Sequence, residues 1–470
     1  MVDFRELYAG KADAPVRVAL VGAGEFGASL ITQSLTHPRM DVVAVADIDT
    51  DRAVNVLLRC GVAGDAIDIC RDAAAVRAAR AQGRVAVAPD GNFLVGSDIH
   101  VLVEATGSPE PAAAVSEAAV LAGHHLVVAT KEMASVCGPI LAKKAADKGV
   151  VFTLPDGDQP SLLIGLISRA ELLGLEVVMA GKASEYDVVW QADAGRLEFH
   201  GRDFAAPDFA GSWDLGDDVA ETLADRAAPL GPTPLKSPPD LCEMTLVCNA
   251  TGLKPDFDTF HAPLARTLEL PDIFRPENAG GILLETGTVD IMNCLRRPDE
   301  LSLAGGVFAI VRCADQETWG VIKAKGIPVS RCGAYGLLHN PVHLLGIEAA
   351  ASILAAVVLG QPTSGRAPKP RYDLCARATR AFKAGEVLTM GGHHHKIEGM
   401  EPIVRPAMAI GPSTPMPFYL GADLTLTRDI IPGQLLMGDM VEEPFGSVLW
   451  RLRREQDDEF DLVSAGTDAC

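Results

Sequence analysis

The chain has 470 residues, of which 48% are apolar, and a formal net charge of −21 with only 41 lysines and arginines. This length predicts two or three domains with their own cores, and the negative field argues against nucleic acid or an anionic membrane as a partner. Ten cysteines without a C-x-x-C pair, no apolar N-terminal core and no uninterrupted apolar run predict a cytoplasmic protein that does not enter membranes.

The most informative motif lies near the start of the chain. Residues 18–21 form an apolar run, Gly22, Gly24 and Gly27 follow it, and Asp47 ends the next apolar run. A bound dinucleotide requires this order of strand, glycine turn, helix, strand and acid, because the glycines let the backbone turn tightly and approach a pyrophosphate at a helix N-terminus. The predicted cofactor-binding residues of this turn are Gly22, Gly24, Glu25, Phe26 and Gly27.

Two further residues bear on which nicotinamide cofactor is bound. The Asp47 carboxylate would accept hydrogen bonds from a ribose diol, which favours NADH, whereas it would repel the 2′-phosphate of NADPH. Arg52 lies five residues on and is able to turn toward such a phosphate, although Arg52 is also typical of a solvated helix start. Both residues belong to the predicted cofactor site, and the choice of coenzyme stays open.

Short β-branched runs alternate with alanine-rich stretches up to residue 155. The expected strands are 18–21, 42–46, 101–105, 126–129 and 150–153. This alternation predicts an α/β fold, a doubly wound parallel sheet of Rossmann type over residues 1–155. Thr106, Gly107 and Lys131 follow two of these strands at the carboxyl edge, where ligands bind. We expect all three to contact the cofactor, with Lys131 at its nicotinamide end.

The middle region, residues 156–370, mixes helices and strands and is predicted to be an α+β domain for substrate binding or dimerisation. The expected elements are a helix at 160–173, strands at 176–180 and 305–312, and an alanine-rich helix at 344–359 that is placed to pack back on the first domain. Residues 212–239 are rich in Asp, Pro and Gly, which is typical of a mobile surface loop or a lid. A linker follows at 361–370.

The C-terminal region, residues 371–470, has short strands and turns. Its segments 378–388 and 426–436 echo each other, since each has a basic residue, a turn through glycine and an apolar run. These paired segments resemble the SAF domain, a small β-clip module. The glycine turn, Glu104-Ala-Thr-Gly107, Thr130-Lys131 and Gly157-Asp-Gln-Pro160 resemble homoserine dehydrogenase-like oxidoreductases in residue order.

Most of the chain, from residue 16 to residue 441, resembles the second type of 1-deoxy-D-xylulose 5-phosphate reductoisomerase-like proteins. The resemblance is carried by Gly157-Asp-Gln-Pro160, Ala180-Gly-Lys182, Ile322-Lys-Ala-Lys-Gly326 and His343-Leu-Leu-Gly-Ile-Glu348. It implies rearrangement of a phosphorylated keto sugar followed by hydride transfer from NADPH or NADH to an aldehyde, with Mg²⁺ or Mn²⁺ as a possible metal, in isoprenoid biosynthesis. Dehydrogenation of homoserine or a related hydroxy acid or sugar acid, and a non-catalytic NAD(P)-binding sensor, are the alternatives.

This resemblance also assigns candidate residues. Lys254, Lys323, Lys325 and Arg331 are the expected phosphate-binding cations, and Lys182 follows a strand where its ammonium would stabilise an alkoxide or supply a proton. Asp156, Asp158 and Glu185 are the candidate metal ligands, although acids in such positions also cap turns. The predicted catalytic residues are Lys182, Lys131, Asp158 and His343.

The histidines leave more than one interpretation open. His339 and His343 are four residues apart, a spacing that places both on one face of a helix, whereas Pro341 between them favours a non-helical connection. The triple histidine at 393–395 is expected to decorate a loop of the C-terminal domain rather than to bind metal. A homodimer or higher homo-oligomer with a small-molecule substrate is expected.

Overall fold

The computed structural model describes residues 3–9, 14–392 and 395–463. Contacts divide the chain into two compact units, one of residues 1–161, 344–401 and 405–470 and one of residues 162–343 and 402–404. Most of the C-terminal region therefore groups with the N-terminal sheet, and the three-domain division stays a prediction. No helix of the described residues is long and apolar enough to cross a membrane.

The first unit contains a parallel sheet of seven strands in the order β3-β4-β2-β1-β5-β6-β7. These strands are β1 (Val16–Val21), β2 (Met40–Ala46), β3 (Ile67–Ile69), β4 (Val85–Ala88), β5 (Val101–Glu104), β6 (His125–Val128) and β7 (Phe152–Thr153). The doubly wound α/β prediction is confirmed, and β3 and β4 add to the expected strands. Because β1 runs to β2 on one side and the chain later returns to β5 on the other, the strand order reverses between β1 and β5.

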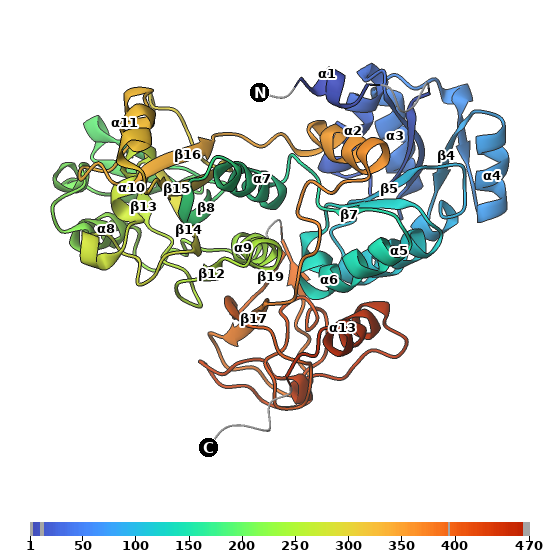
Figure 1. The fold of residues 1–470 in the computed structure, drawn as a ribbon. Coiled ribbons are helices and arrows are strands. Elements are labelled where there is room, and N and C mark those ends of the chain that lie inside the picture. The colour runs from blue at the N-terminus through green and yellow to red at the C-terminus, as the bar shows by residue number, and fades with distance from the viewer. Residues whose placement is uncertain (1–2, 10–13, 393–394, 464–470) are drawn as a thin grey trace. The chain divides into compact units, whose positions relative to one another are not determined.

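Helices cover both faces of this sheet (Figure 1). The helices of the first unit are α1 (Phe4–Leu7), α2 (Glu25–Thr36), α3 (Thr50–Arg59), α4 (Ala73–Ala81), α5 (Pro109–Leu121), α6 (Lys131–Asp147), α12 (Ala349–Leu354) and α13 (Val448–Glu459). Leu30 of α2, Val56 of α3 and Ile353 of α12 share one core with the strands. The alanine-rich stretch predicted at 344–359 is helical in three short pieces and ends at Gly360, which has a φ of +63°.

The second unit is built on a mixed sheet with the path β11-β10-β9-β14-β8-β15-β16, to which β12 and β13 add beside β14. Its strands are β8 (Glu176–Ala183), β9 (Val188–Gln191), β10 (Arg196–Phe199), β11 (Arg202–Ala205), β12 (Lys254–Pro255), β13 (Leu264–Ala265), β14 (Thr288–Arg296), β15 (Val307–Arg312) and β16 (Gly336–Asn340). Eight of the nine residues of β14 are buried, as a strand covered on both faces requires. The strands predicted at 176–180 and 305–312 are present.

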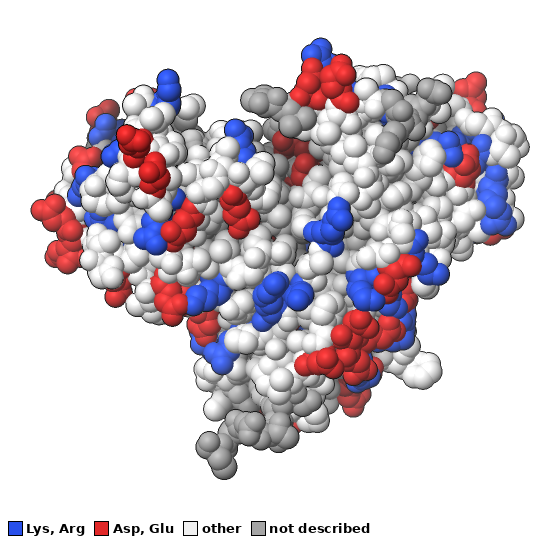
Figure 2. Space-filling model, viewed as in Figure 1, with Lys and Arg blue, Asp and Glu red and all other residues white. Residues whose placement is uncertain are grey.

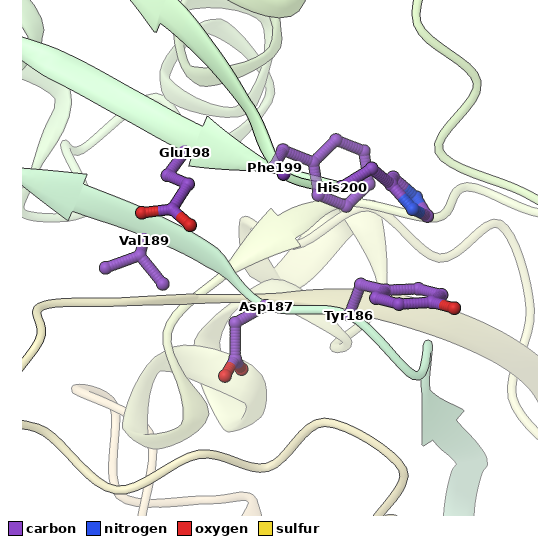
Figure 3. A pocket seen from close by; sticks show the side chains of 7 residues that line it. Tyr186, Asp187, Val189, Glu198, Phe199 and His200 are labelled. Carbon is purple, nitrogen blue, oxygen red and sulfur yellow. The ribbon is translucent and has the colours of Figure 1, made fainter.

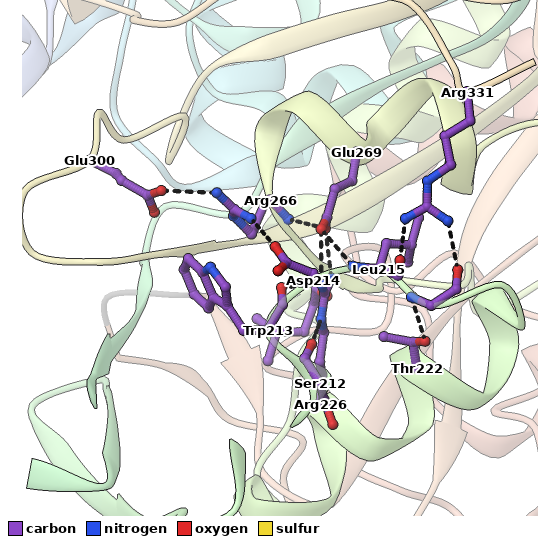
Figure 4. Close-up of polar contacts among 12 residues, drawn as sticks. Ser212, Trp213, Asp214, Leu215, Thr222, Arg226, Arg266, Glu269, Glu300 and Arg331 are labelled. Atoms are coloured by element: carbon purple, nitrogen blue, oxygen red, sulfur yellow. Dashed lines mark hydrogen bonds and ion pairs between the residues drawn. The ribbon is translucent and has the colours of Figure 1, made fainter. Parts of the chain in front are cut away.

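Helices α7 (Gln159–Leu172), α8 (Val219–Ala227), α9 (Pro238–Thr251), α10 (Leu270–Ile273) and α11 (Gln316–Ala324) complete the middle region. Residues 212–239, expected as a loop or lid, contain α8 and the start of α9. Arg226 of α8 is fully buried, donates to the carbonyls of Ser212 and Trp213 at 2.7 Å each, and pairs with Glu269 at 2.8 Å (Figure 4). The arginine supplies the donors that this proline-rich segment needs, so the segment is fixed in place.

The C-terminal region pairs its two echoed segments with each other. Phe382 bridges Ile430 in antiparallel fashion and the Gly385 N–H donates to the Leu426 carbonyl at 2.8 Å, and Gly385 and Gly433 turn with φ of +87° and +85°. The remaining short strands are β17 (Tyr372–Ala378), β18 (Met390–Gly391), β19 (Lys396–Ile397) and β20 (Met400–Pro406). The two segments that are similar in sequence are thus paired in the structure and have the same glycine turn, which fits a clip-like module. The SAF assignment stays a prediction.

Helix α13 joins this region to the N-terminal sheet. Helix α6 is kinked at Cys137, where φ is −137°, because Pro139 has no N–H to donate. Gln456 of α13 fills the kink, donating to the Val136 carbonyl at 3.0 Å and accepting from the Ile140 N–H at 3.3 Å. Acidic and basic side chains gather over α5, α6 and α13 (Figure 2), among them Arg451 paired with Glu117.

Candidate functional site

The glycine turn has the geometry that a dinucleotide needs. Gly22 has a φ of +104°, and a Cβ there would lie 2.3 Å from the Ala105 carbonyl oxygen, while a Cβ on Gly27 would lie 2.2 Å from the Gly22 carbonyl oxygen. At Gly24 a Cβ would meet nothing within 4 Å. Gly24 is the N-cap of α2 and makes no side-chain hydrogen bond, so the first N–H groups of α2, beginning at Glu25 and Phe26, have no capping side chain from this residue and are suited to an anion.

The Asp47 side chain is hydrogen-bonded to the backbone of the glycine turn. Its carboxylate accepts from the backbone N–H groups of Ala23 at 2.8 Å and Asp49 at 2.9 Å, and from the Arg52 guanidinium at 2.6 Å. Burial opposes ionisation of Asp47, but these hydrogen bonds outweigh it and lower its pKa. Arg52 is about half exposed. The two residues that compete over the coenzyme are therefore one ion pair.

The carboxyl ends of β5 and β6 are joined by a polar network. One oxygen of the Glu104 carboxyl accepts from the Thr106 hydroxyl at 2.7 Å and the Thr130 hydroxyl at 2.9 Å, and the Gly107 N–H donates to Thr130 at 2.9 Å. The other Glu104 oxygen has no hydrogen-bond partner within the described part of the chain. Burial raises the pKa of Glu104 despite these donors. This fully buried acid fixes the two turns that we expect to face the cofactor.

The structure brings two predicted catalytic residues together at this edge. Lys131, the first residue of α6, lies 3.9 Å from Asp158, and both side chains are mostly buried. Asp156 is used differently, because its Oδ1 accepts from the Ser161 hydroxyl at 2.5 Å and its N–H donates to Ser352 at 2.7 Å. Burial raises the pKa of Asp156. Asp156 therefore connects the start of α7 with α12.

Lys182 lies at the centre of a buried charge cluster in the second unit. Its Nζ is 2.8 Å from Asp240 and also contacts Glu243, and all three side chains are at most 3% exposed. Lys182 projects from β8, whereas both acids come from α9, which begins with a capping box between Ser237 and Asp240. The two carboxylates stabilise the ammonium inside the protein, which a strand-end lysine at a surface does not need.

A second buried acid of this unit was not predicted. Asp290 on β14 is fully buried and accepts from the N–H groups of His261, Ala262 and Ile291 at 2.8 to 3.1 Å. Burial raises the Asp290 pKa although His261 lies 4.0 Å away. His261 also contacts Asp256 at 2.9 Å. No spacing in the sequence predicts the contact between Asp290 and His261, since they lie on a strand and in a loop nearly thirty residues apart.

Two of the four cations expected to bind phosphate already have other partners. Arg331 donates to the carbonyls of Leu215 and Gly216 (Figure 4), and Lys254 pairs with Glu285 near the surface. Lys323 lies in the last turn of α11 and Lys325 caps that helix, where cations stabilise the free carbonyls. A phosphate subsite made of these four residues stays a prediction.

The helical interpretation of His339 and His343 is wrong. His339 lies on β16, where it pairs with Phe308, and His343 follows in the connection to residue 345, so they share no helix. Pro341 prevents a helix here because it has no N–H to donate. Burial lowers the pKa of His339. A catalytic role of His343 stays a prediction.

The predicted metal ligands do not make a metal site within the described residues, which hold no group of three or more His, Cys, Asp or Glu placed to bind a cation. Glu185 is exposed in the second unit, and Asp156 is engaged by Ser161. Metal dependence stays a prediction without support from this donor set.

A cavity of about 350 Å³ lies at the end of the β9–β10 hairpin (Figure 3). The Tyr186 and His200 rings are 4.3 Å apart at its rim, and Asp187 binds Arg296 at 2.7 Å. None of the predicted site residues lines this cavity. The candidate functional residues therefore form two separate groups, one at the carboxyl edge of the first sheet and one around Lys182 in the second unit.

Residues 237–349 match the family model of the catalytic domain of the oxidoreductase DRL. This segment includes Asp240, Glu243 and Asp290. The match makes this segment similar to an oxidoreductase catalytic domain, and the glycine turn, which lies outside the matched residues, is the part of the chain suited to a nicotinamide cofactor. No curated protein compared with the chain matches it.

Several solved structures match part of the chain. They include GenD2 from gentamicin A biosynthesis in complex with NAD (20% identity, 40% of this chain and 48% of that chain, TM-score 0.26), DOX-P reductoisomerase in complex with magnesium (15%, 36% and 46%, TM-score 0.27) and myo-inositol dehydrogenase from Lactobacillus casei with NAD(H) and myo-inositol (17%, 38% and 48%, TM-score 0.26). The chain spans about half the length of these proteins. With such TM-scores, these likenesses carry no argument about this chain.

Proposed function

We propose that the chain is an NAD(P)H-dependent oxidoreductase that acts on a small phosphorylated sugar, most concretely a reductoisomerase of 1-deoxy-D-xylulose 5-phosphate. The observation that carries this proposal is the Lys182 cluster, whose two acids lie in the segment that matches an oxidoreductase catalytic domain. The choice of substrate comes from the residue motifs that resemble the reductoisomerase-like proteins. A catalytic match also argues against the non-catalytic sensor.

The residues of the first sheet fit a nicotinamide dinucleotide. The N–H groups at the start of α2 are placed for the pyrophosphate, and the Asp47 carboxylate for a ribose diol. Ile48 is 92% exposed directly after Asp47, which offers an apolar surface to an adenine ring. When bound, the cofactor supplies the hydride, and Thr106, Gly107 and Lys131 lie on the side of β5 and β6 that we assign to its nicotinamide half.

In this proposal Lys182 is the charged donor of the reaction. Isomerisation of a keto sugar phosphate passes through oxyanions, and reduction of the resulting aldehyde consumes one hydride and one proton. An ammonium held between Asp240 and Glu243 is preorganised to donate a hydrogen bond to such an oxyanion, so it need not reorient during the reaction. We derive no step through a metal, because the predicted donor set does not fit one.

A second candidate is oxidation of a hydroxy acid or sugar acid without rearrangement. It is favoured by the partners of the expected phosphate-binding cations, since Arg331 is held by two carbonyls and Lys254 by Glu285. A substrate without a phosphate would not need to displace those contacts.

An absorbance assay at 340 nm distinguishes the two candidate functions. Purified protein is mixed with NADPH or NADH, Mg²⁺ or Mn²⁺, and 1-deoxy-D-xylulose 5-phosphate. We expect cofactor oxidation that depends on the sugar, and a 10²- to 10³-fold lower kcat in Lys182→Gln, about the loss that follows removal of one oxyanion donor. Lys143→Gln, which removes an exposed lysine of α6, is the control.

The opposite result is equally informative. If no oxidation occurs with this sugar, but homoserine or another hydroxy acid reduces NAD⁺ or NADP⁺, the reductoisomerase assignment is wrong and the second candidate replaces it. If Lys182→Gln retains full activity with any substrate, the role of the Lys182 cluster is wrong.

A further inference from the structure

A histidine from the C-terminal region reaches the N-terminal sheet. His395 lies in the connection between β18 and β19, with a φ of +42° that is uncommon for a residue with a side chain. Its Nδ1 is 2.6 Å from a carboxylate oxygen of Glu132 in the first turn of α6. Glu132 is almost completely buried, whereas the His395 side chain is about one-third exposed. The histidine is therefore anchored at one nitrogen and accessible at its other side.

That other side faces the turn after β5. A Cβ placed on Gly107 would lie 3.2 Å from Cε1 and 3.7 Å from Nε2 of His395. Because Glu132 binds Nδ1, it fixes which nitrogen points to the turn, as a carboxylate orients an active-site imidazole. Any residue other than glycine at 107 would collide with this ring or move it.

The topology identifies which half of a dinucleotide would lie here. The strand order reverses between β1 and β5, and a dinucleotide bound across that point has its pyrophosphate at the start of α2. The adenosine half then lies toward β2 and Asp47, so the nicotinamide half lies toward β5 and β6, where Gly107, Lys131 and His395 are.

The support behind His395 is rigid. Helix α6, which carries Glu132, is held to α13 through Gln456, and α13 is held to β17 by the buried Arg453, which binds Asp373 at 2.6 and 2.8 Å. Glu110 of α5 accepts from the N–H groups at the start of α13. The C-terminal region is thus packed on α5 and α6, and α6 carries Glu132, the partner of His395.

We propose that His395, held by Glu132, is a cofactor-binding residue that the C-terminal region supplies, and that its Nε2–H donates a hydrogen bond to an oxygen of the nicotinamide nucleotide. The inference rests on the proposed function only in requiring a bound nicotinamide cofactor. The charged groups around His395 are Glu132 and Lys131 on α6, with Glu104 near Glu132 on β5. The hydrogen bond to Glu132 raises the pKa of His395, so that the imidazolium donor persists to higher pH.

Affinity for NADH tests this role without any substrate. The dissociation constant is measured by calorimetry from pH 6 to pH 9 with the full chain, and NADH is chosen because it lacks the titrating 2′-phosphate of NADPH. In the wild type we expect the affinity to fall as the pH rises and His395 loses its proton. In His395→Gln we expect about tenfold weaker binding at pH 6, about 1.4 kcal/mol, and a flat pH profile.

Two further variants test the role of Glu132 and provide a matched control. Glu132→Gln keeps a hydrogen-bond acceptor but removes the charge, so the fall in affinity should begin at a lower pH than in the wild type. Glu398→Gln removes an exposed acid of the same hairpin, which pairs with Lys396 at 3.1 Å, and should bind NADH as the wild type does.

The proposal is overturned if His395→Gln binds NADH with the wild-type affinity and pH profile. The proposed function fails separately, if the wild type binds NADH but oxidises it with no sugar phosphate. If the wild type binds neither NADH nor NADPH, both are wrong.

Discussion

The coenzyme preference depends on a single ion pair. Asp47 and Arg52 are in contact at 2.6 Å, which neutralises the arginine that a 2′-phosphate would need. We therefore predict that NADH binds more tightly than NADPH, and that Asp47→Asn, which frees the Arg52 guanidinium, shifts the ratio of the two affinities about tenfold toward NADPH. Fluorescence titration with each coenzyme measures the ratio, and an unchanged ratio in Asp47→Asn contradicts the prediction.

Lys182 also bears on stability, because a buried charge is tolerated only with its partners. Lys182→Met leaves Asp240 and Glu243 buried without their cation, and we expect it to lower the free energy of unfolding by about 3 to 5 kcal/mol. Adding Glu243→Gln removes one unpaired charge and should restore part of that loss. Urea denaturation of the two variants decides this. If the double variant is less stable than Lys182→Met, the attraction between Lys182 and its two acids is not what stabilises this cluster.

At the scale of elements, Gln456 completes a helix that its own sequence interrupts. Pro139 kinks α6, and the Gln456 amide satisfies the Val136 carbonyl and the Ile140 N–H. Gln456→Ala should lower the free energy of unfolding by about 1 to 3 kcal/mol, the cost of leaving buried polar groups unsatisfied. Asp458→Ala, at an exposed position of the same helix, is the control in urea denaturation. Equal stability of the two variants would show that water replaces the amide.

The elements that the sequence predicts correctly are those whose defining residues lie close together in the chain. Strand β1, the glycine turn and Asp47 all lie between residues 16 and 47, and at Gly22 and Gly27 a side chain would collide with the backbone. The triple histidine 393–395, of which only His395 lies in the described residues, stands out in the sequence, but nothing near it identifies its partner Glu132, which is 263 residues away. Asp290 was missed for the same reason. Lys182 was found as a candidate, but its two acids were not, since they lie on a helix about sixty residues later.

At the scale of the whole molecule, the pH dependence of stability has an identifiable source. Three histidines at one end of β5 and β6 accept hydrogen bonds from backbone N–H groups, which only an unprotonated ring nitrogen can do. His100 accepts from Arg17 at 3.0 Å, His125 from Val151 at 3.1 Å and His124 from Gly96 at 3.4 Å. Burial is the main cause that lowers the pKa of each of the three.

The sign of the effect follows from linkage. Below the ordinary histidine pKa of about 6.5 the unfolded chain binds protons that the folded chain refuses, so stability is present above that pH and is lost as the pH falls toward the lowered folded values. Each histidine contributes at most about 1.4 kcal/mol per pH unit to this slope. His125→Asn keeps an acceptor for the Val151 N–H and does not titrate. Its free energy of unfolding, measured in urea from pH 7.5 to pH 5.5, should therefore fall less steeply than that of the wild type. Since the buried acids and the net charge of −21 are nearly the same in both proteins, their contributions cancel in the difference. Parallel slopes would show that His125 is protonated equally in both states.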